Sequence, residues 1–79
     1  MVQNPNPVAL VIEKHLKRYL DDLGDSEPSN IYQMVLEVVE KPMLELIMQH
    51  ADYNQSLAAN YLGINRNTLR KKLSQHQLI

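Results

Sequence analysis

The hydrophobic positions of the chain fall into helical stretches separated by short polar segments. In the first stretch, apolar residues recur at the spacing of one helix face, at positions 8, 12, 16, 19 and 23. A longer stretch, about residues 30–50, is apolar on most of its circumference, and two short stretches cover residues 55–62 and 66–76. The pattern predicts an all-α fold of four helices.

The segments before the first two helices are rich in residues that interrupt or cap helices. Two asparagines and two prolines in residues 4–7 are incompatible with a helix interior, so residues 1–7 are expected to form a short extended lead. The Gly, Asp, Ser and Pro residues of 24–28 predict a loop. Ser29 or Asn30 is expected to be the N-cap of the long helix.

The two short helices are delimited by residues with specific capping chemistry. Asn54 and Asn65 each stand where their side chain can accept a hydrogen bond from a free N–H of the following helix. Gly63 is expected to end the third helix because it adopts positive φ without steric cost. A short helix, a glycine turn and a second short helix form the layout of a helix-turn-helix.

The long second helix predicts an obligate homodimer. A helix of about twenty residues is roughly 30 Å long, and one copy of the first helix cannot cover its apolar circumference, so the uncovered face needs a second chain. Pro42 is expected to kink this helix without ending it, because the apolar pattern resumes at Met43. The expected dimer interface consists of Ile12, Leu16, Met34, Val35, Val38, Val39, Met43, Leu46 and Ile47.

Composition leaves oligomerisation as the expected means of stabilisation. The chain has 79 residues, is 44% hydrophobic and contains no cysteine, so it should fold as one domain without disulfides or thiolate metal sites. Domains this small usually need a metal, a disulfide or a partner subunit. The longest apolar run, Val8–Ile12, is too short to span a bilayer, and residues 1–7 lack the Lys or Arg of a secretory signal. We therefore expect a cytoplasmic protein without a membrane segment.

The net charge of −1 conceals a strong asymmetry along the chain. Residues 1–53 carry all nine carboxylates and four basic residues, whereas residues 54–79 carry four basic residues and no carboxylate. An acid-free basic end on an acidic body is typical of a surface that faces a polyanion. The alternative is a solvated helix end whose cations favour the helix dipole. The expected organisation is a lead at 1–7, dimerisation helices in 8–51 and a DNA-binding helix-turn-helix in 52–79.

Leu69 and Leu73 define the buried side of the last helix and thereby its outward face. The side chains expected to point outward are those of Asn67, Thr68, Arg70, Lys71, Ser74 and Gln75. Arg66 stands at the helix start, where recognition helices read base edges, and Arg bound to guanine is the commonest specific contact. Asn54 and Ser56, with the free N–H groups of the third helix, suit phosphate contacts.

These motifs resemble those of the bacterial Fis (factor for inversion stimulation) family of nucleoid proteins. The likeness rests on Asn54-Gln55-Ser56, on Ala58-Ala59 and on the run from Leu62 to Leu73, and it continues upstream through Glu40-Lys41-Pro42-Met43-Leu44, so that it spans roughly residues 8–79. The resemblance implies an intertwined homodimer that binds and bends double-stranded DNA at degenerate sites with A/T-rich centres, reading DNA shape and regulating transcription in the nucleoid. By position, it places DNA contacts on Asn54, Ser56, Asn65, Arg66, Thr68, Arg70, Lys71 and Lys72, to which the outward direction of the helix adds Asn67.

Some positions depart from the family pattern. Leu57, Ser74 and Gln75 stand where the family has basic residues, so weaker phosphate binding is expected. Asp52 and Tyr53 replace the basic residue and the glycine of the loop through which enteric members touch RNA polymerase. The lead before the first helix is too short for the hairpin arm that contacts DNA invertases. The sequence therefore does not support an RNA polymerase contact or an invertase contact.

Two other interpretations of the sequence stay open. In the first, the chain is a helical, dimeric protein-interaction module whose basic end docks an acidic partner. In the second, it is the detached output domain of a nitrogen-regulation-type activator, whose C-terminal hairpins look similar; the expectation that the sequence is complete disfavours this.

Catalytic and metal chemistry are not expected. The three histidines have no metal-ligand spacing and are expected at surface or capping positions: His15, His50 and His76. Three glutamates are expected on a solvated helix face: Glu37, Glu40 and Glu45. No phosphate-binding glycine loop, nucleophile triad or reactive cysteine is present, so we expect neither an enzyme nor a cofactor.

Overall fold

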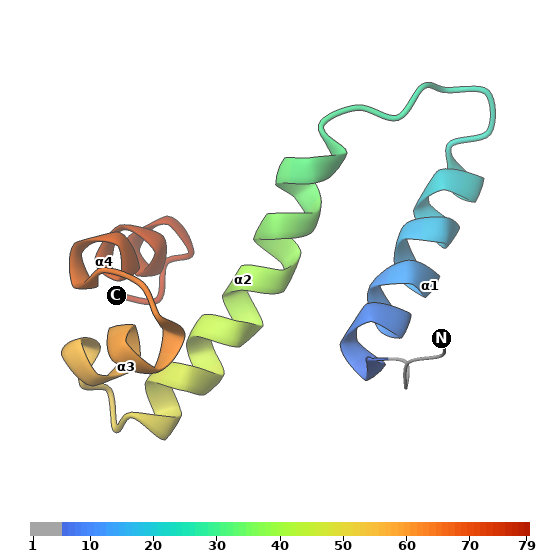
Figure 1. The fold of residues 1–79 in the computed structure, drawn as a ribbon. Coiled ribbons are helices and arrows are strands. Elements are labelled where there is room, and N and C mark those ends of the chain that lie inside the picture. The colour runs from blue at the N-terminus through green and yellow to red at the C-terminus, as the bar shows by residue number, and fades with distance from the viewer. Residues whose placement is uncertain (1–5) are drawn as a thin grey trace. The chain divides into compact units, whose positions relative to one another are not determined.

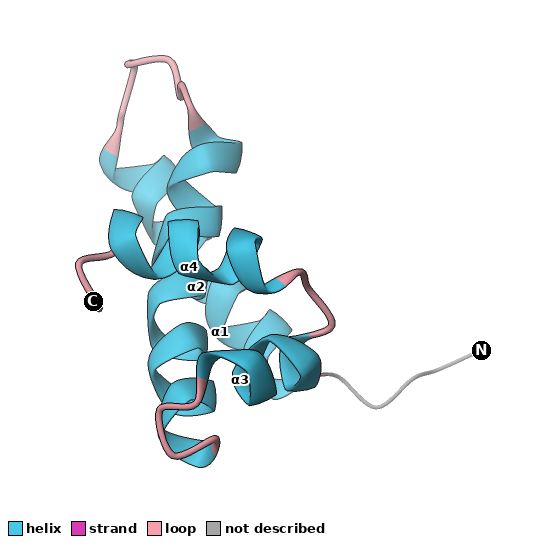
Figure 2. Cartoon of the chain, turned by 90° about the vertical axis from the view of Figure 1, so that its left-hand side faces the viewer, coloured by secondary structure: helices cyan, strands magenta, loops and turns pink. Residues whose placement is uncertain are grey.

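The computed structural model describes residues 6–79, and this range contains four α-helices joined by loops, without strands. The helices are α1 (Pro7–Asp22), α2 (Ile31–His50), α3 (Gln55–Leu62) and α4 (Arg66–Gln75), labelled in Figure 1. The all-α fold predicted from the hydrophobic pattern is confirmed, and Figure 2 shows only helices and loops over the described residues. The chain divides into two compact units, Met1–Ile31 and Tyr32–Ile79.

α1 begins one residue earlier than the hydrophobic pattern predicts. Asn6 is its N-cap, and its Oδ1 accepts hydrogen bonds from the N–H groups of Val8 at 2.8 Å and Ala9 at 3.3 Å. Pro7 therefore takes the first helical position, where its missing N–H removes no helix bond. Excluding Pro7 from the helix was wrong, and the rest of the expected lead, residues 1–5, lies outside the described residues.

α2 continues through Pro42, as predicted, while the expected kink stays a prediction. Of the two proposed N-caps, Asn30 has a φ of 56°, which is left-handed, whereas an N-cap residue has extended backbone, so Asn30 was wrong and Ser29 stays a prediction. Only Leu44 and Met48 of α2 are buried, and both lie in its C-terminal half. None of the helices in the described range is long and apolar enough to cross a membrane.

The core of the second unit is formed by α2, α3 and α4 together. Ala58 and Ala59 of α3 are buried, and these small side chains leave room for α4 to approach closely. Leu69 and Leu73 of α4 are fully buried against them. The complete set of buried residues is Leu44, Met48, Ala51, Ala58, Ala59, Leu69 and Leu73, with Ile47, Leu62, Ile64 and Leu78 packed around it.

α2, α3 and α4 share one kind of C-terminal ending, the Schellman motif. One left-handed residue follows closely after the last residue of each helix: Asp52 (φ 54°), Gly63 (φ 74°) and Gln77 (φ 59°). The N–H of the following residue then reaches back five positions to a helix carbonyl, at 2.7, 3.1 and 2.8 Å respectively. Gly63 was predicted to end α3 in this way. The following residues Ile64 and Leu78 pack on the core, so the endings also fix α3 and α4 against it.

Candidate nucleic-acid interface

α4 presents a polar, basic face to solvent because two leucines hold its other side in the core. Leu69 and Leu73 have no exposed surface. The residues predicted to point outward are all exposed, as expected: Asn67, Thr68, Arg70, Lys71, Ser74 and Gln75. Arg66, at the start of the helix, is exposed as well. The outer face of α4 thus carries cations without any carboxylate on the same helix.

Two asparagines hold the starts of α3 and α4 in place. Asn54 Oδ1 accepts a hydrogen bond from the Leu57 N–H at 3.0 Å, and Asn65 Oδ1 accepts one from the Asn67 N–H at 2.7 Å. Both caps were predicted from the sequence. Capping uses the amide oxygen of each side chain and leaves the Nδ2 hydrogens available to an external acceptor such as a phosphate oxygen.

One hydrogen bond joins two of the predicted DNA contacts across the helix-turn-helix. Arg66 Nη1 donates to Ser56 Oγ at 3.2 Å, which links the first turn of α4 to the first turn of α3. The two residues are ten positions apart in the sequence, and the pairing was not predicted. A guanidinium has five N–H donors in a planar fork, so one bond to Ser56 orients the group without exhausting it.

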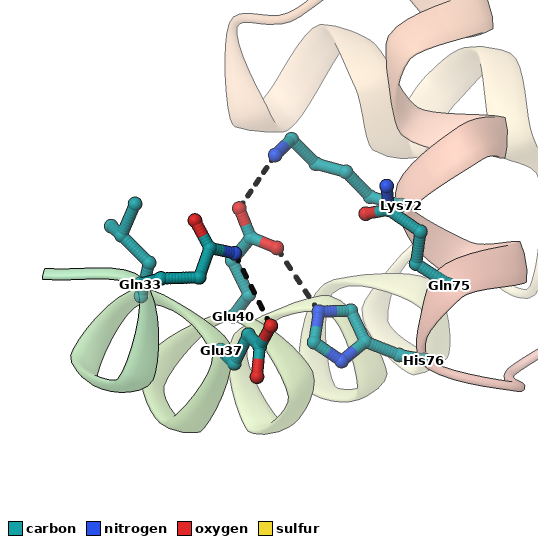
Figure 3. Close-up of a pocket in the computed structure, with 7 residues that line it drawn as sticks. Gln33, Glu37, Glu40, Lys72, Gln75 and His76 are labelled. Atoms are coloured by element: carbon teal, nitrogen blue, oxygen red, sulfur yellow. Dashed lines mark hydrogen bonds and ion pairs between the residues drawn. The ribbon is translucent and has the colours of Figure 1, made fainter. Parts of the chain in front are cut away.

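Lys72, the remaining predicted contact, has its ammonium on a carboxylate of α2. Lys72 Nζ lies 2.6 Å from Glu40 Oε2, and His76 Nε2 lies 3.0 Å from Glu40 Oε1 (Figure 3). Only 17% of the Glu40 side chain is exposed, so the expectation that Glu40 sits on a solvated face was wrong. The cause is its helix register, because Glu40 precedes the buried residues Leu44 and Met48 at steps of four on one face of α2.

The two contacts stabilise the charged form of Glu40. The hydrogen bond from Lys72, and next that from His76, hold the pKa of the Glu40 carboxyl below its ordinary value of 4.5, although desolvation acts in the opposite direction. Glu40 is therefore an anion at neutral pH. The three side chains border a largely polar cavity of about 560 Å³ that is also lined by Gln33, Leu36, Glu37 and Gln75.

The residues predicted to form the dimer interface have different environments in the single chain. Ile47 packs on the core formed by α2, α3 and α4. Three others on α2 are exposed: Val38, Met43 and Leu46. The rest are half-buried: Ile12, Leu16, Met34, Val35 and Val39. Val38 and Leu46 expose 65% and 63% of their surface, so α3 and α4 leave a large apolar area of α2 uncovered.

The other histidines lie on the surface, as expected. His15 is exposed, and the exposed His50 ring lies against Tyr61 with ring centroids 5.8 Å apart. Within residues 6–79, no group of three or more His, Cys, Asp or Glu side chains could hold a metal ion.

Comparison with known proteins places this arrangement in a family. A family model described as "Bacterial regulatory protein, Fis family" matches residues 35–76, which include most of α2 and all of α3 and α4. The chain belongs to the Fis family. Among its relatives, a Fis-like DNA-binding protein of Ralstonia nicotianae is 57% identical over 74 residues, which are 94% of this chain and 96% of that protein.

Two further relatives extend the family match. A Fis-like DNA-binding protein of Neisseria meningitidis is 49% identical over 72 residues, covering 91% of each chain. A protein named DNA-binding protein Fis, from Aliivibrio fischeri, is 47% identical over 70 residues, covering 89% of this chain and 71% of its own length. The predicted family resemblance is therefore confirmed over most of the chain.

Proposed function

We propose that this Fis-family chain is a homodimeric DNA-binding and DNA-bending protein of the nucleoid that regulates transcription. The observation that carries the proposal is the outer face of α4, which is exposed, basic and acid-free, and whose leading residue Arg66 is oriented by Ser56. A helix presented in this way fits the major groove of B-DNA.

The residues of the helix-turn-helix have distinct proposed roles. Arg66 reads a guanine edge with its guanidinium fork. Around it, Asn65, Asn67 and Thr68 offer amide and hydroxyl groups to neighbouring base edges or to the sugar-phosphate backbone. Further contacts go to phosphates, from the exposed cations of α4 and from the start of α3: Arg70, Lys71, Asn54 and Ser56.

A second copy of the chain is the proposed cover for the apolar surface of α2. Val38, Met43 and Leu46 are exposed in a protein that needs to bury apolar area to be stable. α1 has no buried residue and exposes Val8 and Val11, so it would also gain from a partner subunit. Dimerisation would fix two copies of α4 at one separation, and a fixed separation makes binding depend on DNA curvature. Selectivity for easily deformed sites follows from that dependence, and the family resemblance implies that the centres of these sites are A/T-rich.

A mobility-shift titration at low salt tests the DNA-binding proposal. Duplexes with one A/T-centred site at circularly permuted positions should be shifted, and their mobility should depend on the position of the site because a bent centre retards migration. A helical module that docks an acidic protein would give no shift at low salt. If the protein shifts all permuted duplexes to the same mobility, DNA binding would be supported and DNA bending would be refuted.

Thermal unfolding tests the dimer. Folding coupled to dimerisation makes the melting temperature rise with protein concentration. Circular dichroism melts over a hundredfold range of concentration should therefore shift, and sedimentation equilibrium should give twice the 9.1 kDa chain mass. A constant melting temperature with a monomeric mass would contradict an obligate dimer.

A further inference from the structure

We propose that Glu40 is a built-in counterion of the recognition helix, a positioning residue that occupies Lys72 and thereby lowers the strength and the salt dependence of DNA binding. The inference rests on the proposed DNA-binding function of α4. In this proposal, Glu40 of α2 determines how many cations of α4 are available to DNA phosphates.

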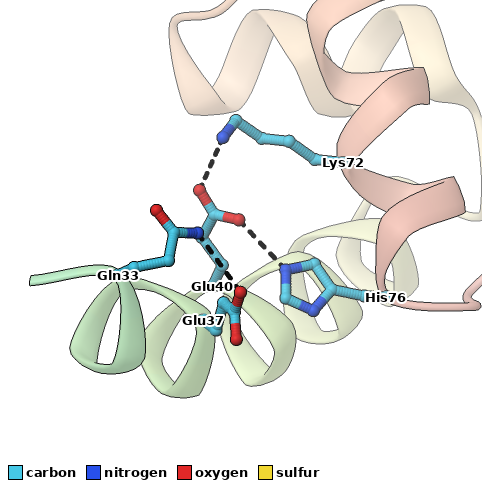
Figure 4. A network of polar contacts seen from close by, with 5 residues as sticks. All are labelled: Gln33, Glu37, Glu40, Lys72 and His76. Carbon is cyan, nitrogen blue, oxygen red and sulfur yellow. Dashed lines mark hydrogen bonds and ion pairs between the residues drawn. The ribbon is translucent and has the colours of Figure 1, made fainter. Parts of the chain in front are cut away.

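The four cations of α4 differ in their surroundings. Arg66, Arg70 and Lys71 are exposed, whereas Lys72 is half-buried and exposes 31% of its side chain. Figure 4 shows the Lys72 side chain directed toward α2, with its ammonium against the Glu40 carboxylate. In its present position the ammonium therefore lies at a flank of α4 next to α2, away from the outer face.

The carboxylate is held in place from two sides. Lys72 Nζ contacts Oε2 at 2.6 Å, and His76 Nε2 contacts Oε1 at 3.0 Å. Lys72 lies on α4, and His76 is the C-cap residue of α4 one turn later, so both partners come from the same side of the helix. The low exposure of Glu40 means that its charge cannot be fully hydrated if Lys72 leaves. Transfer of Lys72 to a phosphate thus costs free energy that transfer of Lys71 does not.

A paired lysine also contributes differently to salt dependence. Each phosphate that a protein neutralises releases condensed cations, and the slope of log K against log salt changes by about 0.9 per phosphate. Lys72 already has a carboxylate as its counterion, so it neutralises no phosphate while the Glu40 contact persists. Removal of the Glu40 charge should free Lys72 to reach the phosphate backbone on its flexible four-carbon side chain.

Glu37 provides a matched control on the same helix. It lies one turn before Glu40, is exposed, and accepts a hydrogen bond from Gln33 Nε2 at 3.2 Å. It also lines the same cavity, but its polar contact is with Gln33 and not with the cations of α4. Glu37→Gln removes the same charge as Glu40→Gln while leaving the Lys72 ion pair intact.

The experiment measures the affinity of the full chain for duplex DNA at several salt concentrations and compares the slope of log K against log salt among variants. Glu40→Gln keeps an acceptor for Lys72 and a polar partner for His76 but removes the charge. We expect it to bind duplex DNA more tightly than wild type at low salt and to steepen the slope by about 0.9 per subunit. The Glu37→Gln slope should equal that of wild type, and Lys72→Gln added to Glu40→Gln should abolish the gain.

Several outcomes would overturn the inference. These are an unchanged slope in Glu40→Gln, an equal steepening in Glu37→Gln, or a slope that Lys72→Gln alone makes shallower by about 0.9. A purely structural role of Glu40 would weaken binding without steepening the slope. If Glu40→Gln fails to fold, a Lys72→Gln slope that is shallower than wild type by about 0.9 still refutes the inference. A wild-type chain that binds no DNA would refute the proposed function as well, whereas wild-type binding with an unchanged Glu40→Gln slope refutes this inference alone.

Discussion

Replacement of Arg66 by alanine is expected to impair sequence reading while leaving the fold intact. Arg66 and Ser56 are both exposed and share one hydrogen bond of 3.2 Å, so the loss of this bond should change the free energy of unfolding by less than about 0.5 kcal/mol. A bidentate arginine–guanine contact is worth about 1–3 kcal/mol of discrimination. Arg66→Ala should therefore weaken binding to a preferred site by roughly 5- to 150-fold.

The companion variants separate the charge from the geometry of the guanidinium. Arg66→Lys keeps the charge but loses the planar fork, so it should lose most of the discrimination and retain non-specific binding. Ser56→Ala removes the orienting hydrogen bond together with the phosphate contact proposed for Ser56, and it should cost about 0.5–1.5 kcal/mol of site binding. With both Arg66 and Ser56 replaced, the loss should be smaller than the sum of the two single losses, because Ser56 acts in part by orienting Arg66.

The assay is a competition titration at fixed salt. A preferred duplex is first selected from a random library with the wild-type protein, and each variant is then titrated with this duplex and with a scrambled duplex of the same composition. Equal losses on the two duplexes would refute base reading by Arg66, because a phosphate contact weakens all sequences alike. Circular dichroism melts serve as the control for folding.

Three further predictions concern stability, each measured by urea unfolding. The pKa of Glu40 lies below 4.5 in the folded state, so the Glu40 carboxylate contributes fully to the free energy of unfolding above about pH 4.5 and loses this contribution as the pH falls below that value. Glu40→Gln should therefore be less stable than wild type at neutral pH, and this difference in the free energy of unfolding should shrink under acidic conditions. A difference that stays constant from pH 6 to pH 3 would contradict this. Gly63→Ala should lower the free energy of unfolding by about 1–2 kcal/mol, and Gln77→Gly should raise it by up to about 1 kcal/mol, since both positions have positive φ; equal signs would refute the backbone explanation. Leu69→Ala should cost about 2–5 kcal/mol, whereas the exposed neighbour Thr68→Ala should cost less than about 0.5 kcal/mol.

Local features of the fold could be predicted from the sequence because their causes are local. Asn54 and Asn65 cap helices through bonds that span two or three residues, and Gly63 ends α3 within one turn. The outward face of α4 followed from the placement of Leu69 and Leu73. The two errors at helix starts have local causes as well: Pro7 is favourable at a first helical position, and Asn30 tolerates the left-handed conformation.

Long-range contacts were missed because spacing within one helix does not show which helices meet. Glu40 is 32 residues from Lys72 and 36 from His76. A signal was nevertheless present, since Glu40 lies on the same stripe as Leu44 and Met48, and a carboxylate on a core-facing stripe requires a cationic partner. Lys72 of α4 is this cationic partner, and His76, one helical turn later, contacts the other carboxylate oxygen.

The contribution of α2 to the core sets a limit on how the helix-turn-helix can be transplanted. Leu44 and Met48 are two of the seven buried side chains of the core that α2 shares with α3 and α4. A fragment that starts after His50 would leave Leu69 and Leu73 without this covering layer and would also lack the carboxylate that holds Lys72. A chimeric protein that borrows this hairpin therefore has to include the second half of the long helix, from Glu40 onward, and the junction belongs upstream of that residue.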